Sequence, residues 1–137
     1  MQGKSLDTNA IIEDKMLVYL SVRCPHCLDL LKAINSSPTV FNKEQIFPIF
    51  KVTPHEIDSF AKSNNLQNIK LYHIPNNYIS KEIKSVPTFL ILDEKNKIKK
   101  VYNGIPRFDN NDSLVTYVNS LLLKNQVIKF MPLESCH

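Results

Sequence analysis

The chain has 137 residues, a net charge of +4, three cysteines and only two glycines. This length suits one domain with its own core, and 43% hydrophobic and 22% charged residues are ordinary for a globular protein. So few glycines exclude collagen-like and flexible-linker classes, and no stretch reaches the roughly 18 consecutive apolar residues that span a membrane. The lysines are scattered without interleaved aromatic residues, which argues against a nucleic-acid surface. We expect one domain over residues 1–137, with 1–14 and 125–137 less ordered.

The first predicted element is a buried strand. The run Met16–Val22 is short, apolar and partly β-branched, which is typical of such a strand. A helix is predicted to begin at the Cys24-Pro25-His26-Cys27 motif, because proline suits the first helical turn. Its apolar face repeats at helical spacing, and the helix should end before Pro38. The residues of this face are Leu28, Leu31 and Ile34.

The middle of the chain predicts a second strand and a second helix. The apolar run 46–52 favours a strand, and Pro48 within it suggests an edge position or a bulge. Thr53 is the predicted N-cap of the next helix, with Glu56 completing a capping box. Residues 69–74 could form a short strand, and residues 76–84 have weak helical spacing.

The clearest strand is predicted over Val86–Leu92. A turn at 93–97, with Asn96 in the left-handed conformation, should return the chain as a partner strand over 98–102. Gly104 then marks a bulge or bend, and a last helix is expected after a cap at Asp112 or Ser113. The order of elements predicts an α/β fold with a mixed central sheet flanked by helices on both faces.

The candidate chemistry lies in the Cys-x-x-Cys motif. Cys24 would sit at the positive end of a helix, where unpaired N–H groups favour a thiolate. A histidine between the cysteines can act as a cation or an N–H donor, and Arg23 adds a second positive neighbour. We therefore predict Cys24 as the nucleophile and Cys27, shielded one turn later, as the thiol that resolves a mixed disulfide. Pro25 and His26 complete the predicted catalytic set.

Three segments resemble the thioredoxin-like family. Leu17–Cys27 is similar to the family's strand and active-site segment, and Val86-Pro87-Thr88 begins a segment similar to its cis-proline strand. Asn103-Gly104 before the last helix is similar to the closing unit of the fold, so the resemblance runs from about residue 16 to 123. It implies a thiol–disulfide oxidoreductase acting on cysteines of protein substrates, with no metal or organic cofactor. It also implies a cis bond at Pro87 and substrate contacts from Val86, Pro87, Thr88 and Arg23.

The number of residues between Cys27 and Pro87 indicates which branch of the family the chain resembles. The 59 residues 28–86 between the second cysteine and the proline fit the TlpA/ResA-like branch, whereas Pro25-His26 resembles DsbA. A depressed Cys24 pKa would make the protein more oxidising than a plain thioredoxin. Arg23 replaces the family's usual tryptophan, and Val18 replaces a buried acid that several branches carry. Glu56, Asp58 or water could substitute for that acid.

Other interpretations stay open at this point. A zinc site could combine Cys24, His26 and Cys27 with Cys136 or His137, although a second ligand pair would then come from a tail. The protein could also be a non-catalytic binding module on the same fold. Cys136 and His137 are interpreted as bystanders. We expect a monomer with a separate recycling partner.

The expected compartment is extracytoplasmic, in a bacterial periplasm or cell envelope, as a mature form without its leader. The N-terminal residues lack the apolar core of a signal peptide, so a cytoplasmic protein is the alternative.

Overall fold

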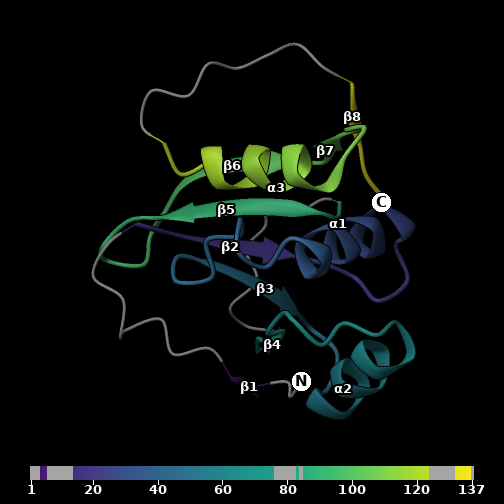
Figure 1. The fold of residues 1–137 in the computed structure, drawn as a ribbon. Helices are drawn as coiled ribbons and strands as arrows, with labels where there is room; N and C mark the ends of the chain where they lie inside the picture. The colour runs from purple at the N-terminus through teal and green to yellow at the C-terminus, as the bar shows by residue number, and fades with distance from the viewer. Residues whose placement is uncertain (1–3, 6–13, 76–82, 84, 124–131, 137) are drawn as a thin grey trace.

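The computed structural model describes residues 4–5, 14–75, 83, 85–123 and 132–136 (Figure 1). The helices are α1 (Pro25–Ser36), α2 (Pro54–Ser63) and α3 (Asn111–Ser120). The strands are β1 (Lys4–Ser5), β2 (Lys15–Tyr19), β3 (Ile46–Phe50), β4 (Tyr72–His73), β5 (Thr88–Leu92), β6 (Ile98–Asn103), β7 (Ile105–Pro106) and β8 (Leu133–Glu134). Within these ranges, none of the helices has the length and apolar character needed to cross a membrane.

Six strands form the main sheet in the order β1-β4-β3-β2-β5-β6. β2 lies parallel to β3 and antiparallel to β5, and β5 pairs antiparallel with β6. The sheet is therefore mixed, as the sequence predicts. β7 and β8 form a separate two-stranded sheet, which brings the end of the chain beside the strand that follows β6 (Figure 1).

Alternate residues of the central strands face two different clusters of buried side chains. Met16 and Val18 of β2 pack with buried residues of all three helices. Leu17 belongs to the second cluster, with Phe47, Ile49, Ile74, Leu90 and Leu92. The described helices thus supply one face. The weak helix predicted at 76–84 falls mostly outside the described residues, so helical cover of the second face stays a prediction.

Several local predictions are confirmed. The Thr53 hydroxyl accepts a hydrogen bond from the Glu56 N–H at 3.2 Å and caps α2. Asn96 has φ +64° in the β5–β6 turn, and Gly104 has φ +84° at the bend after β6. Residues 72–73 form the short strand β4.

Two predictions are wrong in detail. Pro48 lies in β3, which has β2 on one side and β4 on the other, not at an edge. The proline is tolerated because its backbone nitrogen is not needed for pairing on either side. Leu20 N–H donates to Ile49 O, so the backbone groups of Ile49 face β2 and those of Pro48, one residue earlier, face away from β2. On that other side, the residues of β3 that pair with β4 are Ile49 and Phe50.

The second correction concerns the last helix. Asn110 caps α3 by accepting a hydrogen bond from Ser113 N–H at 2.8 Å. Asp112 instead accepts a hydrogen bond from the Ser37 hydroxyl just after α1. The carboxylate predicted to cap α3 therefore links α3 to the end of α1.

Candidate active site

Cys24 occupies the N-cap position of α1 with extended backbone angles, φ −94° and ψ 120°. Its carbonyl accepts the first helical hydrogen bond, from Leu28 N–H at 3.1 Å, and Pro25 follows in the first turn. No side chain caps this end of the helix. The Cys24 sulfur therefore stands at the positive end of α1, where a negative charge is stabilised.

Cys27 lies one turn further along α1 and is 0% exposed. Burial raises the pKa of its thiol to about 11, and a backbone hydrogen bond with Ser21 offsets part of this effect. Such a thiol is protonated at neutral pH and hidden from outside reagents. Cys27 thus has the shielded position that the sequence predicts for the resolver, and its role stays a prediction.

A tyrosine that the sequence did not single out lies near the resolver. Burial raises the pKa of Tyr19, and the proximity of Cys27 raises it further. Tyr19 is the last residue of β2, which directly precedes the Cys-x-x-Cys loop. Tyr19 packs against the second cluster of buried side chains, whereas Cys27 belongs to the first. The alternation of residues along β2 therefore gave no sign of the electrostatic coupling between Tyr19 and Cys27.

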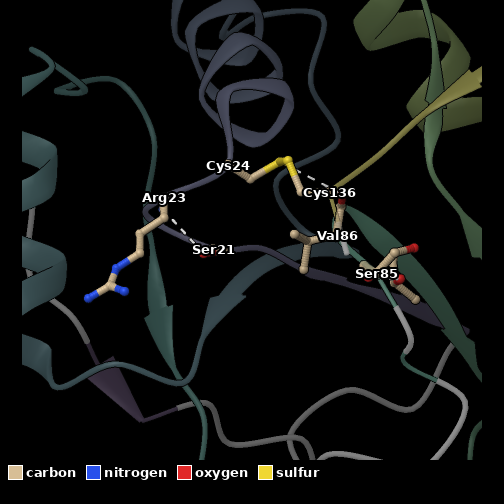
Figure 2. The surroundings of a disulfide bond; sticks show 7 residues. Ser21, Arg23, Cys24, Ser85, Val86 and Cys136 are labelled. Atoms are coloured by element: carbon tan, nitrogen blue, oxygen red, sulfur yellow. Dashed lines mark hydrogen bonds between the residues drawn. A yellow bond between two sulfur atoms is a disulfide. The ribbon is translucent and has the colours of Figure 1, made fainter.

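The structure joins Cys24 to Cys136 in a disulfide, with 6.0 Å between their Cα atoms (Figure 2). Cys27 is the free cysteine. The prediction that Cys136 is a bystander is therefore wrong, and Cys24 is only 4% exposed rather than outward-facing. The physical reason is backbone pairing of the chain end, because Cys136 forms an antiparallel bridge with Val86. The odd number of cysteines was the only signal in the sequence for this partner.

The expected proline loop lies against the motif. The Val86–Pro87 peptide bond is cis, and the Val86 carbonyl oxygen is 3.8 Å from Cys24 Sγ. Thr88, predicted to contact substrate, is instead 0% exposed. Its hydroxyl donates to the Ser85 carbonyl at 2.5 Å and lies 2.8 Å from the Asn103 side-chain oxygen. Thr88 therefore holds the loop from inside.

The two predicted positive neighbours of Cys24 differ in position. Figure 2 shows the Arg23 side chain extending away from the disulfide, while its backbone N–H donates to Ser21 Oγ at 3.2 Å. His26 is half-buried and lines a cavity of about 490 Å³, together with Asp29, Arg107, Phe108 and Glu134. His26 thus lies beside a cavity whose lining includes neither Cys24 nor Cys27, and the Arg23 side chain points away from the disulfide.

The proposed zinc set is not assembled in the part of the chain that the structure describes. Within that part, no group of three or more His, Cys, Asp and Glu side chains could hold a metal ion. Two of the candidate ligands, Cys24 and Cys136, are bonded to each other. His137 lies outside the described residues.

Solved structures with a similar fold were found, although no protein-family model and no curated protein matches the sequence. The pneumococcal exposed lipoprotein thioredoxin of Streptococcus pneumoniae aligns with a TM-score of 0.58 and 12% identity, over 88% of this chain and 99% of its own. StoA of Bacillus subtilis aligns with a TM-score of 0.53 and 20% identity, over 78% and 83%.

A third similar structure is a secreted disulfide oxidoreductase of Mycobacterium tuberculosis. It has a TM-score of 0.56 and 11% identity, over 88% of this chain and 95% of its own. All three alignments cover most of both chains, as expected if the whole architecture is shared. Together with the mixed sheet, the Cys-x-x-Cys motif at the start of α1 and the cis-proline loop, they show that the chain has the thioredoxin-like fold predicted from its motifs.

Proposed function

We propose that this protein is a thiol–disulfide oxidoreductase that exchanges disulfides with cysteines of protein substrates through Cys24 and Cys27. The observation that supports this most is the covalent state of Cys24. Its sulfur is bonded to a cysteine of an extended segment that pairs with Val86 beside the cis-proline. A substrate bound by strand addition and joined to Cys24 in a mixed disulfide would have this arrangement.

The exchange would proceed in two steps. The Cys24 thiolate attacks one sulfur of a substrate disulfide, so that a Cys24–substrate disulfide forms and the other substrate sulfur leaves as a thiolate. Cys27 then loses its proton and attacks Cys24 Sγ, which forms the Cys24–Cys27 disulfide and releases the second substrate thiolate. Run in reverse, the same steps oxidise a substrate dithiol. Neither direction needs a metal or an organic cofactor.

The oxidising character is part of the proposal. The uncapped N-terminus of α1 favours the Cys24 thiolate, which stabilises the reduced form of the pair, and His26, two residues along the chain, would add to this effect as a cation or an N–H donor. A protein with that property is a better oxidant than a plain thioredoxin. A separate redox partner would return the pair to its starting state, and the protein would act as a monomer.

The proposed location is extracytoplasmic, in a bacterial periplasm or cell envelope. Two structurally similar proteins are described as an exposed lipoprotein and as secreted. A disulfide in the resting structure also suits an oxidising compartment.

A second candidate function follows from the same disulfide. A Cys24–Cys136 bond could serve only to fasten the chain end, which would leave a non-catalytic binding module on this fold. The two candidates differ in what Cys24 does to an outside disulfide.

The deciding experiment is a disulfide-reduction assay with insulin and a small thiol as reductant. The wild-type chain should accelerate precipitation of the reduced insulin chains, and Cys24→Ser should return the rate to that of the small thiol alone. Ser59→Ala in α2, exposed and outside the exchange steps, is the control and should keep the wild-type rate. Activity that survives in Cys24→Ser would refute the assigned nucleophile, and an inactive wild type would favour the binding module.

A further inference from the structure

The segment 132–136, called here the docking segment, occupies the backbone N–H and C=O of Val86 next to the cis-proline, called here the Val86 edge. Val86 N–H donates to Cys136 O at 2.8 Å, and Cys136 N–H donates to Val86 O at 2.7 Å. Figure 2 shows Cys136 beside the start of α1, next to both Cys24 and Val86. Backbone pairing and a covalent bond thus hold the same residue.

A second attachment holds the docking segment two to three residues before Cys136. Its strand β8 pairs antiparallel with β7, with Glu134 opposite Ile105. The Glu134 carboxylate also accepts a hydrogen bond from the Arg107 guanidinium at 3.2 Å. Backbone hydrogen bonds therefore hold the docking segment at both Glu134 and Cys136, in addition to the disulfide.

Gly104 makes this close approach possible. A Cβ atom at this position would lie 3.1 Å from both Glu134 O and Leu133 Cβ, which is closer than such atoms normally approach. The positive φ of Gly104 also disfavours other residues. A glycine here thus leaves room for the docking segment as well as serving the bend after β6.

An extended segment with these contacts has the form of a bound substrate. Its backbone pairs with Val86 beside the cis-proline, and it presents a cysteine to the sulfur at the start of α1. Because it belongs to the same chain, it is present at a high effective concentration. Cys24 then has little exposed surface for an outside disulfide.

We infer that Cys136 is a third redox-active cysteine and that the docking segment is a tethered substrate of the Cys24–Cys27 pair. The inference rests on the proposed function. Cys27 loses its proton and attacks Cys24 Sγ; the Cys24–Cys136 bond breaks and the Cys24–Cys27 bond forms. Cys136 leaves as a thiolate and takes up one proton. One disulfide replaces another, so no oxidant or reductant is consumed.

The exchange links the closed and open states of the site. With Cys24 bonded to Cys136, the Val86 edge is filled and Cys24 is buried. With Cys24 bonded to Cys27, the covalent link to the docking segment is gone, and an outside peptide can compete for the Val86 edge. The raised pKa of Cys27 slows the opening step at neutral pH, because only the thiolate attacks.

Peptide mapping of the full chain tests the inference. Trypsin would place Cys24 and Cys27 together in peptide 24–32 and Cys136 in peptide 130–137. The protein is equilibrated in glutathione buffers, quenched with acid, blocked with N-ethylmaleimide and digested. Wild type should yield both the linked pair of peptides and an internally bridged 24–32. Their ratio should not change with the glutathione redox ratio, because the two forms are isomers.

The variants give separate readouts. Cys27→Ala should yield only the linked pair, and Cys136→Ser only the internal bridge. Gly104→Ala should lower the proportion of linked peptide severalfold relative to wild type, since its Cβ crowds the docking segment. After a jump from pH 5 to pH 8, wild type enriched in the linked form should convert at a rate independent of protein concentration. That rate should rise about tenfold for each further pH unit below the pKa of Cys27.

Two outcomes would overturn the inference. One is the absence of the linked peptides at every glutathione ratio; the other is a linked form that never converts to the internal bridge. Either could occur while the chain still reduces insulin through Cys24, so the proposed function would stand. An inactive chain that nevertheless shows the conversion would refute the proposed function and leave the internal exchange in place.

Discussion

Cys27→Ala in a Cys136→Ser background is expected to convert the protein from a catalyst into a trap. Cys24 can still attack a substrate disulfide, but nothing within the chain resolves the mixed disulfide that results. Intramolecular groups in good geometry act at effective molarities of up to about 10⁵ M or more, far above any added thiol. Turnover with insulin should therefore fall at least about a hundredfold, while a stable adduct between protein and substrate appears in the mass spectrum.

The Cys136→Ser single variant is the control for this experiment, because it keeps Cys27 and should turn over without accumulating the adduct. Cys27 is 0% exposed and alanine leaves a small cavity, so the thermal midpoint of both variants should also be compared. An unchanged rate in the double variant, with the fold intact, would contradict the role of Cys27 as resolver.

Phe89→Ala is expected to lower the free energy of unfolding by a large amount for a single substitution in the core. Phe89 is the second residue of β5, is 0% exposed, and stands opposite Val18 of β2 and Tyr102 of β6. Removing a fully buried aromatic ring loses its transfer free energy and leaves a cavity, so the free energy of unfolding should fall by about 3–5 kcal/mol. Urea unfolding of the reduced protein measures this directly.

Ile98→Ala on the neighbouring strand is the matched control. Ile98 is 39% exposed, and its truncation should change the free energy of unfolding by no more than about 0.5 kcal/mol. Similar losses for the two variants would show that the sheet is not packed as described here.

Much of the fold could be predicted because local physics and tertiary packing agree along most of the chain. The Thr53 cap, the left-handed Asn96 and the apolar runs of the central strands each carry a short-range signal. The prediction for Pro48 failed because its position depends on where β4 begins to pair, which is a property of the assembled sheet. The cap of α3 shifted to Asn110 for a similar reason, since Asp112 has a partner at Ser37.

The candidate site was predictable only in part. The motif at the start of α1 and the cis-proline strand carried enough pattern to place Cys24, Cys27, Val86 and Pro87. Cys136 could not be placed in this way, because segment 132–136 has no periodicity of its own and pairs through backbone atoms that every residue possesses. The orientation of Arg23 and the burial of Thr88 likewise depend on three-dimensional neighbours rather than on spacing.

A redox titration of the Cys136→Ser chain tests the central claim most directly. The chain is equilibrated in dithiothreitol or glutathione buffers of known potential, and the fraction of Cys24–Cys27 disulfide is read by mass after thiol blocking. The account predicts one reversible two-electron transition with a midpoint less negative than about −270 mV, the value of a plain thioredoxin. Failure of Cys24 and Cys27 to form a disulfide at any potential would contradict it.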